Sequence, residues 1–138
     1  MGTGQTFLTM GAIAIFMYMS MNINRSYIIA RAQNVDHQIE LDAVNYGLSV
    51  CEVMYSQAFN YSQLDTFYGN FNDVNNPSKR LDYVTVLGDS LSATISLSIE
   101  KEIIQGVDGR EATITIYRWD DGQPIQVSEH LASIMSLE

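Results

Sequence analysis

The two histidines, the one cysteine and the acidic residues are the side chains that could hold a metal ion or act as a nucleophile. His37 and His130 lie 93 positions apart, and Cys51 stands beside the acidic Glu52. A structural zinc site takes four Cys or His ligands, and a reactive thiolate is favoured by a basic neighbour. We therefore predict no metal site, no cofactor site and no reactive cysteine, and we expect Cys51 to behave as a small buried hydrophobe.

The acidic residues near the glycines are better explained by turns than by cation binding. Asp108 precedes Gly109, and Asp120 and Asp121 precede Gly122. Neither stretch has the alternating oxygen ligands of an EF-hand calcium loop. Asp and Gly are common in hairpin turns because both tolerate the backbone conformations that turns require.

No motif of an enzyme active site is present. The sequence contains none of GxSxG, GxxxxGK[ST], HExxH and GxGxxG. We predict no catalytic residues and a protein that is not an enzyme.

Trp119, beside Tyr117 and Arg118, could belong to an adhesive patch, although a half-buried strand aromatic is the simpler interpretation. Asn60 begins an Asn-Tyr-Ser sequon on a predicted loop and is a possible glycosylation site.

Charge is distributed unevenly along the 138 residues, whose formal net charge is −9. Residues 1–35 carry only Arg25 and Arg31, whereas residues 36–138 carry all 16 acids. A chain of this acidity repels phosphate backbones, so we predict no nucleic-acid partner. The chain therefore consists of an uncharged, then weakly basic N-terminal part and an acidic remainder.

The N-terminal part contains an apolar run over residues 6–23, without charge or proline. A run of this length can span the hydrocarbon core of a bilayer as a helix. A secretory signal peptide is one alternative, but no basic residue precedes the run, and the stretch MSMNINRS at its end is a poor cleavage site. A buried helix of a soluble core is another, and it would need apolar partners on every side.

The composition of the run also suits packing against other helices. Gly11, Ala12 and Ala14 form a small-residue patch that another backbone can approach closely, and methionines fill irregular gaps. The residues that we expect to pack in such a core are Phe7, Leu8, Met10, Gly11, Ile13, Ala14, Ile15, Phe16, Met17 and Met19.

The helical pattern continues past Arg25. Two apolar stripes at helical spacing predict a wide apolar face, and the helix is expected to run from about Gln5 to Phe59, roughly 80 Å. One stripe is Ile39, Ala43, Tyr46, Val50 and Val53; the other is Leu41, Val44, Leu48, Cys51, Tyr55 and Phe59.

After a polar loop the period of the sequence changes to two. Alternation over residues 93–100 and 112–119, with shorter runs at 83–87 and 125–127, predicts about four antiparallel strands joined by hairpins. The fold class is therefore α+β, a long N-terminal helix packed on a small antiparallel sheet. The predicted division is a transmembrane or filament-core helix (1–25), an amphipathic continuation (26–60), a polar loop (61–81) and a sheet domain (82–138).

This order of elements resembles the type IV pilin superfamily, including pseudopilins and archaeal filament subunits. The local match is Gly4-Gln5 directly before the apolar run, which by the resemblance is the position where a leader would be removed. The resemblance implies a structural subunit of an extracellular helical filament, whose partners are copies of itself. It also implies a stage in the inner or cytoplasmic membrane and contact with an export and assembly machinery.

The sequence departs from the pilin pattern at one position, and a second function stays open. The fifth residue counted from Gln5 is Thr9, where pilins usually carry Glu, and no acid precedes Asp36. The alternative is a single-pass, membrane-anchored envelope protein, such as a minor pseudopilin or a binding module, that does not form filaments.

Overall fold

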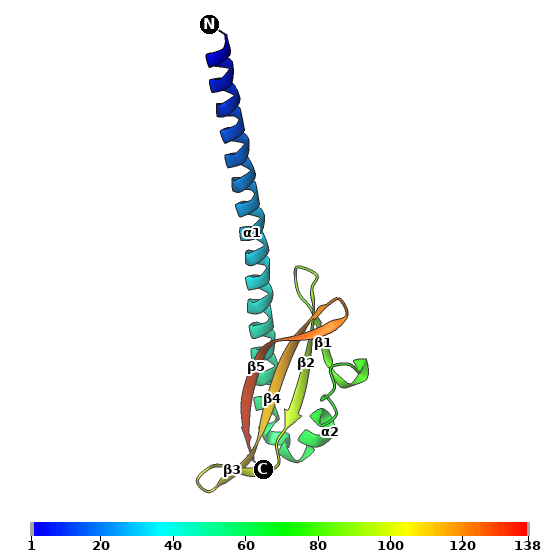
Figure 1. Ribbon diagram of the computed structural model, residues 1–138. Helices are drawn as coiled ribbons and strands as arrows, with labels where there is room; N and C mark the ends of the chain where they lie inside the picture. The colour runs from blue at the N-terminus through cyan, green and yellow to red at the C-terminus, as the bar shows by residue number, and fades with distance from the viewer. Residues whose placement is uncertain (1, 138) are drawn as a thin grey trace. The chain divides into compact units, whose positions relative to one another are not determined.

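The computed structural model describes residues 2–137; Met1 and Glu138, which the predicted segments 1–25 and 82–138 included, lie outside the described residues. The elements follow in the order α1 (Thr3–Ser56), η1 (Gln57–Gln63), α2 (Leu64–Tyr68), η2 (Pro77–Lys79), β1 (Leu81–Val84), β2 (Ser90–Leu97), β3 (Lys101–Ile104), β4 (Val107–Asp120) and β5 (Gln123–Met135) (Figure 1). This is the predicted α+β fold, and the helix prediction is confirmed to within three residues at each end.

Contacts within the chain define two compact units, Met1–Gln38 and Ile39–Glu138. The division falls inside α1, within the segment 26–60 that we expect to be its amphipathic continuation. Its physical reason is that Ile39 is the first residue of the helix to be buried by other elements. Charge marked the end of the apolar run at Arg25, whereas tertiary contact begins only at Ile39.

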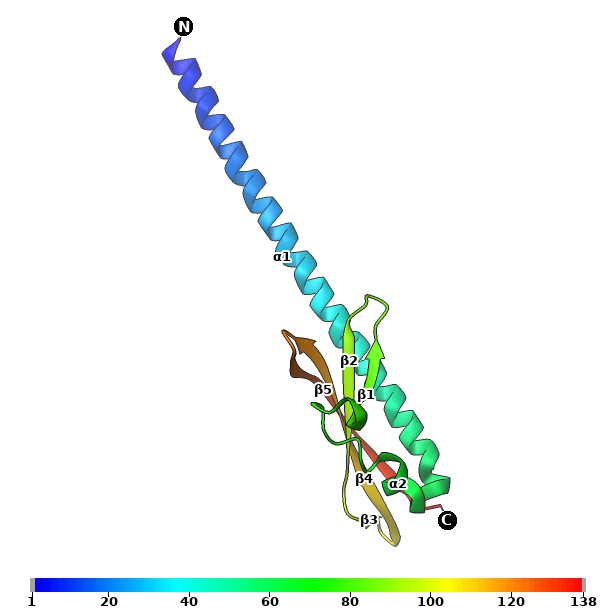
Figure 2. The same ribbon diagram turned by 90° about the vertical axis from the view of Figure 1, so that its right-hand side faces the viewer.

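The second unit contains one antiparallel sheet. Its hydrogen-bonded order is β1-β2-β4-β3, and β5 pairs with the other edge of β4. Strand β3, which sequence periodicity did not predict, is a four-residue hairpin arm that pairs with the start of β4. Figure 2 shows β2, β4 and β5 lying side by side.

Glycine-containing turns connect the strands. The β4–β5 turn places Asp121 at φ 48° and Gly122 at φ 76°, the two positive values that a two-residue hairpin turn of type I′ requires. The prediction of a turn at residues 120–123 is therefore confirmed. The preceding hairpin turns at Gly106 (φ 82°), and Asp108 and Gly109, which we expected in that turn, belong to β4 instead.

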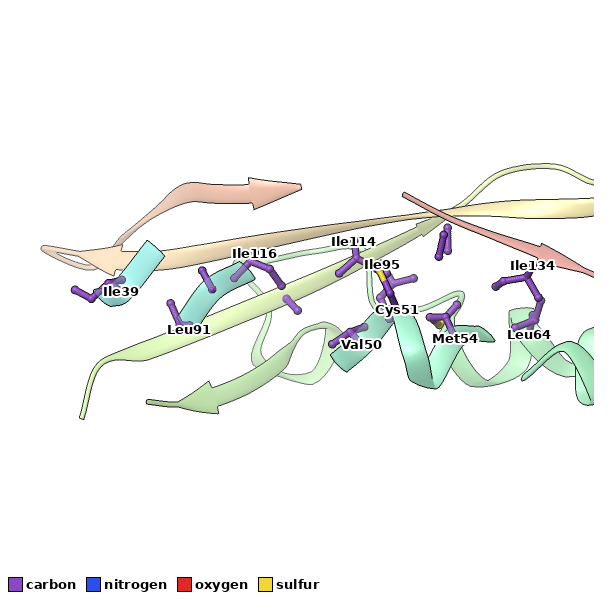
Figure 3. Close-up of a cluster of buried hydrophobic side chains, with 14 residues drawn as sticks. Ile39, Val50, Cys51, Met54, Leu64, Leu91, Ile95, Ile114, Ile116 and Ile134 are labelled. Atoms are coloured by element: carbon purple, nitrogen blue, oxygen red, sulfur yellow. The ribbon is translucent and has the colours of Figure 1, made fainter. Parts of the chain in front are cut away.

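The last turns of α1 cover one face of this sheet. Ile95 of β2 and Ile114 and Ile116 of β4 are completely or almost completely buried against the helix (Figure 3). The buried helix residues are Ile39, Ala43, Gly47, Val50, Cys51 and Met54. Alternating strand residues and one helix stripe thus form a single core, as the two sequence periods predict.

The apolar face of the helix is, however, narrower than its sequence predicted. Of the second stripe only Cys51 is buried; Leu41 is 58% exposed and Phe59 is 72% exposed. Of the first stripe, Ile39, Ala43 and Val50 are buried, whereas Val53 at its end is 49% exposed.

The segment predicted as a polar loop, residues 61–81, contains short helical turns. Helix α2 lies beside the last turns of α1 and η1 in both views (Figures 1 and 2), and Leu64 is buried in the core. Arg110 Nη1 of β4 donates to Asp65 Oδ2 at 2.6 Å, and this hydrogen bond lowers the pKa of the Asp65 carboxyl. Tyr61, Tyr68 and Phe71 pack against the core, whereas Phe67 is half exposed.

Gly47 of α1 lies directly beside His130 of β5. A Cβ atom at this position would collide with the imidazole ring of His130, whose Nε2 is buried and has no hydrogen-bond partner. The absence of a side chain therefore lets strand and helix pack together here, at the cost in helix propensity that glycine carries.

We expect Gly47→Ala to destabilise the sheet unit by about 1–3 kcal/mol, because overpacking outweighs the gain of up to about 1 kcal/mol in helix propensity. The measurement is denaturant unfolding followed by fluorescence of Trp119, the one tryptophan of the chain. In a His130→Ala background the same substitution should cost much less, since the obstructing ring is gone. Gly11→Ala, in the same helix but with open space around it, is the control and should not lower stability.

Candidate assembly surface

The predicted core residues form a continuous apolar surface on α1. Every described residue from Gly2 to Gln38 is exposed within the chain, including Phe7 at 74% and Leu8 at 78%. This part of α1 is long and apolar enough to cross a membrane, by length and composition. An exposed apolar surface of this extent marks a contact with lipid or with protein.

The structure places all ten predicted packing residues on this helix, and none of residues 2–137 buries them. They are Phe7, Leu8, Met10, Gly11, Ile13, Ala14, Ile15, Phe16, Met17 and Met19. A Cβ atom at Gly11 would meet nothing within 4 Å. The small-residue patch at Gly11 and Ala14 is therefore open to a partner from outside the chain.

The polar groups near the start of this surface are satisfied locally. Thr6 Oγ1 donates to the carbonyl of Gly2, and Thr9 Oγ1 donates to the carbonyl of Gln5 at 2.7 Å. Threonine can return such a hydrogen bond to the preceding helical turn and then needs no charged partner. Thr9, at the position where pilins usually carry Glu, is thus neutral and already hydrogen-bonded inside its own helix.

The possible processing position lies in the first turn of α1. The helix begins at Thr3, so Gly4 and Gln5 are both helical and exposed. The first turn of a helix lacks partners for its N–H groups and opens at lower cost than the interior does. Cleavage between these residues stays a prediction.

The structure also places Cys51, the potential metal ligands and Asn60, which the sequence analysis considered as candidate sites. Cys51 is buried in the core, and this burial raises the pKa of its thiol. Among residues 2–137, no group of three or more His, Cys, Asp or Glu is arranged to hold a metal ion. Asn60 is exposed on the 3-10 helix η1, at a kink with φ −123° and ψ 39°.

Trp119 is a half-buried strand aromatic, as expected, but its surroundings were not predicted. Its indole Nε1 donates to Ser92 Oγ at 2.8 Å, and the guanidinium of Arg80 lies 4.6 Å from its ring centroid. Tyr117 and Arg118, its sequence neighbours, take no part in these two contacts. The relevant partners come from β2 and from the residue before β1, which no sequence spacing connects to Trp119.

Comparison with protein-family models, with characterised proteins and with solved structures gives no match.

Proposed function

We propose that this protein is a structural, non-catalytic subunit of an extracellular, pilus-like helical filament, which polymerises through the apolar N-terminal part of α1, residues 3–24. The observation that supports this proposal is the apolar helix surface that no described part of the chain covers. Copies of the same helix are the partner class that fits it, because the surface is apolar on all sides and carries an open small-residue patch.

Burial of this surface stabilises the filament relative to subunits whose helix is exposed to water. Each large apolar side chain that is kept out of water in a helix core contributes about 1.5–3 kcal/mol. Eight of the ten packing residues are of this kind, and their combined contribution is larger than the ordering costs of association. Head-to-tail contacts between subunits that do not close into a ring generate an open helical filament. In this filament the acidic sheet unit faces solvent.

Before assembly the same segment would reside in the inner or cytoplasmic membrane. A helix of this length and composition can cross a bilayer. Assembly then exchanges lipid contacts for helix contacts, and small residues such as Gly11 allow the close approach that this exchange requires. An export and assembly machinery is the partner that this step needs.

The second candidate is a membrane-anchored envelope protein that stays single. The neutral Thr9 favours it, since the resemblance to pilins includes an early carboxylate that this chain lacks. Electron microscopy of material sheared from cells, together with immunoblots of washed membranes, separates the two. Filaments that contain this chain support assembly; retention of the whole population in washed membranes, without filaments, contradicts it.

Filaments of this protein should be nearly indifferent to salt up to about 1 M. The Debye length is then about 3 Å, so exposed ion pairs weaken strongly, but no Asp, Glu, Lys, Arg or His lies between Thr3 and Asn24. Hydrogen bonds such as that of Thr9 stay inside each helix. Sedimentation of filaments at low and high salt provides the measurement. Release of subunits at high salt would instead indicate an ionic contact, with Arg25 or Arg31 as its basic partner.

A further inference from the structure

The sheet unit carries an open cleft of about 490 Å³ beside β1. Its walls include Tyr83 and Val84 of β1, Trp119 near the end of β4, and Gly122 of the following turn. Small-molecule sites typically have volumes of this order and combine apolar or aromatic walls with a few polar groups. The residues that line the cleft all belong to the second unit.

A connected polar network fixes one wall of the cleft. Asp82 Oδ1 accepts from Arg80 Nε at 2.8 Å and from Ser92 Oγ at 2.6 Å. Ser92 Oγ in turn accepts from the indole of Trp119, and Arg80 Nη1 donates to the carbonyl of Val74 at 2.9 Å. The aromatic ring, the guanidinium and the carboxylate are thus held in place before any ligand arrives, which lowers the ordering cost of binding.

The charges that line the cleft favour an uncharged ligand. Arg80 is compensated by Asp82, so the lining has no net charge and offers an ionic ligand no uncompensated partner. Asp82 nevertheless remains 54% exposed, and both of its hydrogen bonds are made by Oδ1. The site therefore presents a hydrogen-bond acceptor next to apolar and aromatic surface, without net charge.

We propose that this cleft binds a neutral saccharide. A pyranose has hydroxyl groups that donate to a carboxylate and an apolar C–H face that packs on aromatic or aliphatic surface, as at Trp119 and Val84. This binding site is independent of filament formation, and it would give the exposed domain a recognition role that the proposed structural function does not require.

Trp119 reports on the cleft directly because it is the one tryptophan of the chain. The full-length protein, purified in an amine-oxide detergent so that no sugar headgroup competes, is titrated with four probes: the methyl pyranosides of glucose, galactose and mannose, and N-acetylglucosamine. Concentrations reach about 50 mM, since weak small-ligand sites have Kd values near the millimolar range. We expect a saturable change of Trp119 emission with at least one probe.

Two exposed valines provide a matched pair of variants. Val84, 63% exposed, lines the cleft, whereas Val86, 98% exposed, does not. Val84→Phe should weaken binding at least tenfold by filling the cleft, and Val86→Phe should leave it unchanged. Asp82→Asn should also weaken binding, with folding checked by its thermal transition.

The proposal is overturned if none of the four probes produces a saturable change, or if glycerol at equal hydroxyl concentration produces the same one. Equal binding by the Val84→Phe and Val86→Phe variants would likewise place the sugar elsewhere. Saturable binding of acetate or tetramethylammonium, without any pyranoside, would show an ionic site and contradict the argument from charge balance.

Discussion

Replacement of Ala14 by Asp should abolish filament formation while the sheet unit stays folded. Ala14 is exposed within the chain and lies in the middle of the apolar run. In an assembled helix core its carboxylate would be buried without a cationic partner, because no basic side chain precedes Arg25. A buried unpaired charge costs several kcal/mol, and every subunit of the filament would carry that cost.

Two further variants make this experiment specific. Ala32→Asp introduces the same carboxylate beyond the apolar run, beside Arg31, and should leave filament yield nearly normal. Gly11→Leu keeps the segment apolar, so that membrane insertion is preserved, but holds neighbouring backbones apart and should also reduce assembly. Filament yield is measured by electron microscopy and sedimentation. Normal filaments from both Ala14→Asp and Gly11→Leu would show that residues 3–24 do not form the contact between subunits.

The sheet unit itself should be unaffected by these substitutions. The contacts of the chain separate Met1–Gln38 from Ile39–Glu138, and no core residue of the second unit precedes Ile39 among the residues described. Unfolding followed at Trp119 should therefore give the same midpoint for Ala14→Asp and for the unaltered chain. A lowered midpoint would mean that loss of filaments reflects misfolding.

Sequence periodicity predicted those elements whose pattern is long and regular. The alternation of Ile114 and Ile116 with threonines repeats over many residues, and both isoleucines are buried as expected. Turn chemistry was equally informative at Asp121 and Gly122, where two positive φ values are required. In these cases a local rule and the tertiary structure agree, so the sequence was sufficient.

Sequence periodicity did not predict burial or pairing where these depend on a neighbouring element of the fold. Leu41 and Ala43 belong to stripes that look alike in sequence, yet only Ala43 is buried. Strand β3 is too short to display a period, and its pairing depends on the hairpin to β4. Both facts require knowledge of the partner element.

The cleft beside β1 shows the same limit for a candidate site. Trp119 was recognisable by residue type, but Arg80 and Ser92 join it only because the antiparallel order brings β1, β2 and β4 together. The register pairs Asp82 with Ser92 across the first two strands. The hydrogen-bond network around Trp119 therefore could not be predicted from the strands alone, without the register in which they pair.

Deletion of residues 1–25 should convert the protein from a membrane or filament component into a soluble, folded monomer. The deletion removes the whole apolar run but none of the buried core, which begins at Ile39. The remaining chain keeps all 16 acids and loses only Arg25 among the charged residues, so its net charge becomes more negative and opposes association. Size-exclusion chromatography without detergent, together with a cooperative unfolding transition at Trp119, provides the measurement.

A longer deletion locates the true boundary of the folded unit. Removal of residues 1–50 would also take away Ile39, Ala43 and Val50, and leave the apolar face of the sheet uncovered. Loss of a single buried Leu- or Ile-sized side chain costs about 2–5 kcal/mol, so loss of the covering helix exceeds the 5–15 kcal/mol by which a domain is usually stable. We therefore expect the chain without residues 1–25 to fold and the chain without residues 1–50 not to fold. If the chain without residues 1–25 aggregates, residues 1–25 are part of the folded unit, because this variant differs from the intact protein only by their absence.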